Sequence, residues 1–194
     1  MDFFTADWHL NDEMILKACR RPFKTAARMT EVYVKQANQR AKTKADTIVH
    51  VGDFIQRGLD RGTGDRESQV SASEALASLS ANVVLLEGNH DGSNRCRTAG
   101  SVLVRRLCGI DCVVQHYPST DRRAVLPPSP GGVLVNVCGH VHDRWRFMYD
   151  EENQVLNVNV GIDVYPHMAK ETDLALDVAK ELKRLGLKAG RLLR

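Results

Sequence analysis

Histidine, aspartate and asparagine residues stand together at several places in this sequence, each time directly after a short apolar stretch. They form the segments Asp7-x-His9, Gly52-Asp53, Gly88-Asn89-His90-Asp91, His116 and Gly139-His140-Val141-His142. Imidazole, carboxylate and amide donors together suit divalent ions such as Mn²⁺, Fe²⁺ or Zn²⁺. One such histidine alone would more often be structural than a ligand, but five of the seven histidines lie in these contexts. The set therefore predicts a metal site.

These side chains are numerous enough to hold two ions, provided that one carboxylate bridges them. Asp53 lies in the middle of the set and is the natural bridge. Two ions about 3.5–4 Å apart hold a hydroxide between them at neutral pH and stabilise the oxygens of an in-line displacement at phosphorus. The predicted chemistry is therefore the hydrolysis of a phosphoester. His50 and His167 fall outside the pattern, and we interpret them as structural.

Short apolar stretches predict the strands that must position these side chains. They span residues 2–6, 46–51, 82–87, 110–115, 132–138 and 154–161. Apolar residues at helical spacing predict helices at 25–44, 71–79 and 172–194. Strands with intervening helices favour an α/β fold, but the later strands follow one another too closely for a purely parallel sheet. We therefore expect two mixed sheets covered by helices.

The stretch VVLLEGNHD at 83–91 illustrates the relation between strand and site. Four apolar residues precede a glycine and then an amide, an imidazole and a carboxylate. A strand running into an ordinary Gly-Asn turn would give the same pattern. Because ligands bind at the ends of strands in open α/β sheets, the repeated pattern favours a site, with the strand as its rigid support.

Composition limits the class of protein. The 194 residues are 43% hydrophobic and 26% charged, which is typical of one soluble globular domain spanning 1–194. No apolar run is long enough for a transmembrane helix, and the N-terminus lacks the basic region of a secretory signal. Five cysteines without a CxxC pair indicate free thiols, so we expect a cytoplasmic protein without membrane partners.

The net charge of +3 suits an anionic substrate but is too small to predict a nucleic-acid groove. We therefore expect no stable complex with nucleic acid. The segment 172–194 is expected to form a packed C-terminal helix, and an exposed apolar face on that helix would permit a homodimer.

As a set, the polar segments resemble the signature of the calcineurin-like metallophosphoesterase superfamily: D-x-H, G-D, G-N-H-[DE], a lone H and G-H-x-H. The signature is complete and in order between residues 7 and 142. The resemblance implies a four-layer α/β/β/α sandwich, with two mixed sheets flanked by helices and a dinuclear site at the rim. It assigns the first ion to Asp7, His9, Asp53 and His142. It assigns the second ion to Asp53, Asn89, His116 and His140.

The resemblance also implies catalytic side chains beside the ions. His90 matches the family histidine next to the scissile phosphate, where it stabilises the transition state or protonates the leaving oxygen. Asp91 is expected to be its companion or a group that supports it. The larger phosphoprotein phosphatases read G-D-x-x-D-R-G, whereas Gln56 replaces the second Asp here, which disfavours an efficient protein phosphatase. Arg57 remains a candidate phosphate contact, with an ordinary surface arginine as the alternative.

Further segments are similar to short metallophosphoesterases of phages and bacteria. These are FFTADWHL at 3–10, CRRPF at 19–23, HYP at 116–118 and NVGIDVY at 159–165. Members of such groups often act on phosphodiesters, cyclic nucleotides among them. The resemblance thus implies a dinuclear phosphodiesterase for small phosphodiesters, with 2′,3′-cyclic nucleotides favoured, acting by attack of a metal-bridging hydroxide. The expected cofactors are two Mn²⁺ ions, with Fe or Zn as alternatives.

Two other functions remain open at this point. A phosphomonoesterase or a nuclease would use the same ions, and the sequence barely separates them from a phosphodiesterase. A non-catalytic scaffold is the other alternative. Such scaffolds usually lack ligands or the histidine of the G-N-H segment, whereas this chain has all of them.

Overall fold

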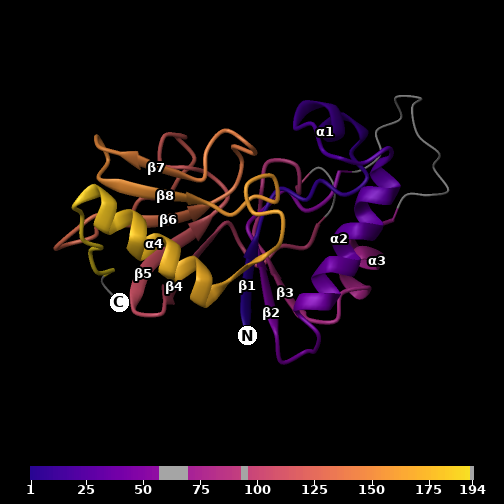
Figure 1. The fold of residues 1–194 in the computed structure, drawn as a ribbon, viewed down its shortest axis with the longest axis horizontal. Coiled ribbons are helices and arrows are strands. Elements are labelled where there is room, and N and C mark those ends of the chain that lie inside the picture. The colour runs from indigo at the N-terminus through magenta and orange to yellow at the C-terminus, as the bar shows by residue number, and fades with distance from the viewer. Residues whose placement is uncertain (57–69, 93–95, 193–194) are drawn as a thin grey trace.

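In this computed structural model, which describes residues 1–56, 70–92 and 96–192, the chain forms two β-sheets (Figure 1). The first sheet contains β1 (Asp2–Thr5), β2 (Thr47–His50), β3 (Asn82–Leu85) and β9 (Ala169–Lys170). Its strand order is β3-β2-β1-β9. Strands β1, β2 and β3 are parallel, and β9 pairs antiparallel with β1.

The second sheet has the strand order β4-β5-β6-β8-β7. Its strands are β4 (Val102–Leu107), β5 (Ile110–Gln115), β6 (Leu134–Cys138), β7 (Phe147–Asp150) and β8 (Val155–Asn159). Strands β5, β6 and β8 are parallel, whereas β4 and β7 run antiparallel to their neighbours. The prediction of two mixed sheets is therefore confirmed.

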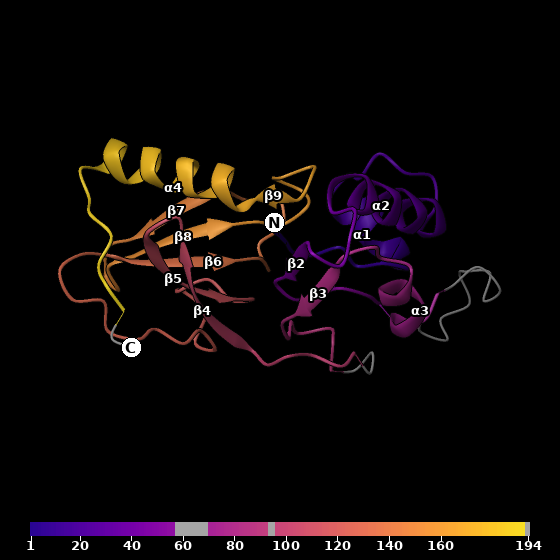
Figure 2. The same cartoon turned by 90° about the horizontal axis from the view of Figure 1, so that it is seen from below.

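Helices flank both sheets. Figures 1 and 2 show α1 (Glu13–Ala18), α2 (Ala26–Arg40) and α3 (Ala72–Ala77) beside the first sheet, and α4 (Glu171–Leu185) over the second. The side chain of Thr25 caps α2, and Ser71 and Glu74 form a capping box at the start of α3. These caps satisfy backbone N–H groups that the first turn leaves unpaired.

The first sheet is buried on both faces. On one face, Phe3 packs with Met29 and Tyr33 of α2. On the other face, Phe4 packs in a cluster that also contains Val137 of the second sheet and Leu174 of α4. A strand buried on both sides needs a continuous apolar sequence rather than alternation, which explains why the sequence pattern of these strands is uninterrupted.

The C-terminal helix is shorter than the predicted range 172–194. It begins at Glu171 and ends at Leu185, because Gly186 takes a left-handed conformation with φ of 69°. The N–H of Leu187 then bonds to the carbonyl of Leu182, which closes the helix end. Residues 187–192 continue without helix, and 193–194 lie outside the described residues. The assignment of 1–194 to one domain stays a prediction.

Several short elements were not predicted from the sequence. They are α1, β4, β7 and β9. In the described parts of the chain, no helix has the length and apolar character needed to cross a membrane.

His50, at the end of β2, lies in an apolar environment. Its ring meets the rings of Trp8 and Phe54 edge-on, at centroid distances of 5.2 and 5.1 Å. Among the described residues, neither ring nitrogen has a hydrogen-bond partner. Burial lowers the pKa of His50 to about 3, so this histidine is neutral in the folded protein.

We expect His50 to make the protein less stable in acid. The unfolded chain takes up a proton at His50 below about pH 6.5, whereas the folded chain does not, so the free energy of unfolding falls as pH decreases. Between about pH 6.5 and about pH 5 the loss from this residue is about 2 kcal/mol. Urea unfolding of metal-free His50→Leu should show a pH dependence weaker by this amount. His167→Leu, at an exposed position, is the control; an unchanged pH dependence in His50→Leu would contradict the prediction.

Candidate metal centre

The predicted site residues lie just beyond strand ends of both sheets. Asp7 and His9 follow β1, Asp53 follows β2, and Asn89 and His90 follow β3. From the second sheet, His116 follows β5, and His140 and His142 follow β6. Because β1, β2 and β3 are parallel to one another, as β5 and β6 are, the carboxyl ends of these strands carry the site.

The backbone at five of these residues is left-handed. The φ angles are 58° at Asp7, 48° at His9, 55° at Asp53, 72° at His140 and 51° at His142. This conformation costs on the order of 1–2 kcal/mol for a residue other than glycine, and Asp and His tolerate it better than most. Strain of this kind persists where the surroundings impose it, and it is concentrated at functional sites.

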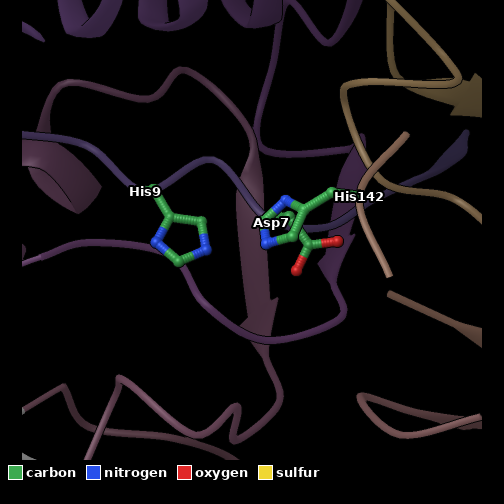
Figure 3. Close-up of side chains that lie close together, drawn as sticks. All are labelled: Asp7, His9 and His142. Atoms are coloured by element: carbon green, nitrogen blue, oxygen red, sulfur yellow. The ribbon is translucent and has the colours of Figure 1, made fainter. Parts of the chain in front are cut away.

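One group of side chains consists of Asp7, His9 and His142 (Figure 3). A ligand atom of each lies within 4.8 Å of one from each of the others. Asp7 and His9 are buried, and neither ring nitrogen of His9 has a hydrogen-bond partner among the described residues. The two nitrogens lie 3.5 Å from carboxylate oxygens of Asp12 and Asp53 instead. Because buried polar atoms are nearly always hydrogen-bonded, a buried histidine in this position indicates a place for a cation.

A second group consists of Asp53, His116 and His140, again with ligand atoms within 4.8 Å of one another. The Nε2 atom of His116 lies 3.2 Å from Asp53 Oδ2 and 3.1 Å from Asn89 Oδ1. The Nδ1 atom of His140 lies 3.2 Å from the same His116 nitrogen. The residues expected around the second ion are therefore brought together.

The carboxylate of Asp53 lies between the two groups. Its Oδ2 atom is 3.5 Å from His9 Nε2 and 3.2 Å from His116 Nε2. Burial raises the pKa of Asp53, but the hydrogen bond from His116 and the nearby positive charges outweigh it and hold the pKa well below the usual range. Burial lowers the pKa of His116, but its contact with Asp53 and the charge of Asp7 outweigh that effect and raise the pKa to about 9. Two buried carboxylates, Asp7 and Asp53, thus stand among the histidines, which is a donor set that suits cations.

In each histidine of the two groups, one ring nitrogen is left for an ion. The second ring nitrogen lies next to an oxygen that belongs to neither group. The pairs are His9 Nδ1 with Asp12 Oδ2 at 3.5 Å, His116 Nδ1 with the Val51 carbonyl at 2.9 Å, His140 Nε2 with Asp121 Oδ2 at 3.8 Å, and His142 Nδ1 with Asp163 Oδ2 at 3.1 Å. Such partners orient metal-binding imidazoles and leave the inner nitrogen for the ion. The donor set and its surroundings therefore fit divalent metal ions.

Glycine lets the polar segments approach one another closely. A Cβ atom at Gly88 would lie 2.3 Å from both the backbone nitrogen and Oδ1 of Asp53. A Cβ atom at Gly139 would lie 2.8 Å from Oδ2 of Asp7. Neither contact is sterically possible, so both positions require glycine. In the stretch VVLLEGNHD, Gly88 therefore leaves room for Asp53 as well as forming a turn.

His90 adjoins both groups. Its backbone N–H donates to Asp53 Oδ1 at 2.8 Å, and its ring centroid lies 4.9 Å from that of His9. The Nδ1 atom of His90 lies 2.9 Å from Oε1 of Gln56, so the residue that replaces the expected aspartate still contacts the histidine. The contact is with a neutral amide, which orients the ring but adds no negative charge.

The other two predicted catalytic residues differ in outcome. Asp91 is fully buried, and its two carboxylate oxygens accept hydrogen bonds from the backbone N–H groups of Asp53, Phe54 and Gly88. Of the two roles expected for Asp91, this arrangement favours the supporting one. Arg57 lies outside the described residues.

Sequence reasoning missed the groups that surround the ligands. Asp163 contacts His142, and Arg21 binds Asp163, yet neither residue was assigned a role. Both lie in segments whose similarity to the short subgroup was visible, CRRPF and NVGIDVY. Asp12 and Asp121 carry no sequence signal of this kind.

We expect Asp53→Asn to abolish most of the stabilisation that Mn²⁺ gives. Asparagine keeps the size of the side chain and tolerates a left-handed backbone, but it removes the shared negative charge. A ligand at about 100 times its Kd stabilises a protein by about 2.7 kcal/mol, which a thermal shift detects. The variant should lose more than half of the Mn²⁺-dependent shift, whereas Asp173→Asn, on the exposed side of α4, should keep it. Equal shifts in both variants would contradict the role of Asp53.

Comparisons with known proteins agree with this geometry. The sequence model of the family described as calcineurin-like phosphoesterase matches residues 3–121. An uncharacterised protein of Methanocaldococcus jannaschii is 29% identical over 185 residues, which cover 93% of this chain and 92% of that protein. A structure of a protein of unknown function from Aquifex aeolicus has the same fold, with 17% identity, a TM-score of 0.58, and coverage of 95% and 98% of the two chains. Since the family match covers more than half of the sequence, the chain belongs to the calcineurin-like phosphoesterases, which are metal-dependent enzymes.

Proposed function

We propose that this enzyme is a phosphodiesterase that holds two divalent ions and hydrolyses small phosphodiesters, with 2′,3′-cyclic nucleotides as the favoured substrates. The observation that carries the proposal is the position of Asp53 between two groups of ligands. One carboxylate within reach of histidines from both groups is the arrangement that a pair of neighbouring ions requires.

Each ion would have its own ligands in addition to Asp53. Asp7, His9 and His142 would hold the first ion, and Asn89, His116 and His140 the second. When bound, the ions would lower the pKa of a water molecule and neutralise the charge on a phosphoryl group. Mixed imidazole and carboxylate donors suit Mn²⁺, with Fe and Zn as alternatives.

His90 would act on the leaving group of the substrate. Its ring lies beside His9, and Gln56 holds its Nδ1 side, so the ring is fixed at the edge of the site. From there His90 would donate a proton to the departing ester oxygen. A strained cyclic diester is a suitable substrate, because its leaving alkoxide is built into the ring and the small molecule needs little binding surface.

An aromatic ring and a guanidinium group stand next to the second group. The ring of Tyr117 lies 5.2 Å from that of His140, and the Arg123 guanidinium stacks on Tyr117 at 3.9 Å. Asp121 holds Arg123 through bonds of 2.8 and 2.6 Å, so the arginine is fixed although it is exposed. A stacking surface with a fixed positive charge is compatible with a nucleotide substrate.

A substrate panel with added Mn²⁺ tests the proposal. We expect the highest kcat/KM with 2′,3′-cyclic nucleotides, lower values with bis-p-nitrophenyl phosphate and 3′,5′-cyclic nucleotides, and the lowest with p-nitrophenyl phosphate. A preference for the monoester would identify a phosphomonoesterase, and faster cleavage of an oligonucleotide would identify a nuclease. No phosphate-ester hydrolysis at all would favour the scaffold.

We expect His90→Ala to lower kcat by roughly 100-fold, the contribution typical of a general acid, without loss of bound Mn²⁺. Elemental analysis of the loaded protein measures the metal content, and steady-state kinetics measures kcat. His167→Ala, at an exposed histidine, is the control. His90 also forms a group of possible ligands with His9 and Asp53. If His90→Ala lost an ion, the residue would be a ligand and the assigned role would be wrong.

The remaining expectations stay predictions. They are the cytoplasmic location, the absence of a stable nucleic-acid complex and the homodimer. For the homodimer, Leu176 on α4 is an exposed apolar residue that a second copy would cover.

A further inference from the structure

Arg21 is a buried arginine next to the first group of ligands. Its Nη2 atom donates to the carbonyl of Asp7 at 2.6 Å, and its Nη1 atom donates to the carbonyl of Trp8 at 2.8 Å. Its Nε and Nη2 atoms each donate to one oxygen of Asp163, both at 2.8 Å. One guanidinium therefore holds both the loop after β1 and a carboxylate far away in the sequence.

Asp163 continues this chain of contacts to a ligand. Its Oδ2 atom lies 3.1 Å from Nδ1 of His142. Arg21, Asp163 and His142 are thus linked in series, and Arg21 also binds the backbone between Asp7 and His9. All the ligands reached in this way belong to the group of Asp7, His9 and His142.

We propose that Arg21 and Asp163 are positioning residues that set the metal affinity of the group formed by Asp7, His9 and His142, without touching ion or substrate. The inference rests on the proposed function, because it assumes that this group holds one of two ions. The inference goes further, because it names two residues outside the ligand set that control the binding of this ion and not of the other.

The physical reason lies in the two ring nitrogens of His142. When Asp163 accepts the Nδ1–H of the ring, Nε2 keeps its lone pair for the ion. Bidentate binding by Arg21 keeps the carboxylate oriented. The negative charge behind the imidazole then strengthens its bond to a cation.

Among the described residues, the other group is supported by different side chains and at a longer distance. His116 faces the backbone carbonyl of Val51 at 2.9 Å, and His140 Nε2 lies 3.8 Å from Asp121, which Arg123 holds. Neither contact involves Arg21 or Asp163. Loss of the arginine–aspartate pair is therefore expected to weaken one ion and leave the other unchanged.

Calorimetric titration of metal-free protein with Mn²⁺ tests the inference through binding rather than activity. Asp163→Asn keeps the size of the side chain, and Arg21→Lys keeps the positive charge, but each breaks the bidentate pair. In both variants, one of the two binding steps should weaken by about 10- to 100-fold, the usual effect of removing such a partner. The visible absorption of Co²⁺-loaded protein, which reports ligand geometry, should change for one ion only.

Asp177→Asn is the matched control, because Asp177 pairs with Arg146 at the surface of α4. It should bind both ions as the wild type does. Unchanged binding in Asp163→Asn, or an equal weakening of both ions, would overturn the inference, since equal weakening indicates a general structural loss. If Arg21→Lys fails to fold, Asp163→Asn decides alone. A wild type that binds one ion would contradict the two-ion proposal, and the inference would then stand only if Asp163→Asn weakens that ion at least 10-fold.

Discussion

The Asp53 carboxylate is shared by histidines that come from opposite sheets, and the rest of the site depends on this sharing. A buried carboxylate is costly unless it is neutralised. His9 approaches it from the first sheet and His116 from the second. The absent side chain of Gly88 and the left-handed backbone of Asp53 are what allow these groups to meet. The strained backbone conformation thus brings the candidate metal donors close together.

The groups behind the ligands differ in kind. Asp91 holds three backbone N–H groups and so fixes the loops after β2 and β3 relative to each other. Gln56 orients His90 without giving it charge. The site thus has a buried carboxylate that anchors its loops and a neutral amide that contacts the proposed proton donor.

Much of this arrangement could be predicted from the sequence, because strand ends carry the ligands and both features have local signatures. The strand at 110–115 follows from such a local pattern, whereas the grouping of Asp53 with His116 and His140 came from the family resemblance. Contacts between distant segments leave no local signature, so Asp163 and Arg21 had no assigned role. Short elements such as β9 depend on pairing with β1. The helix end at Gly186 was missed because apolar spacing continues past it.

Each of the two groups assigned to an ion draws its side chains from both sheets, and this has a consequence for how the protein assembles. Asp7 and His9 come from one sheet and His142 from the other, and the partners of Asp53 are divided in the same way. These two groups are complete only after the sheets have docked, so uptake of both proposed ions would report completed tertiary assembly. Conversely, a chain whose two halves separate slightly would release its cofactor while its helices and strands were still intact.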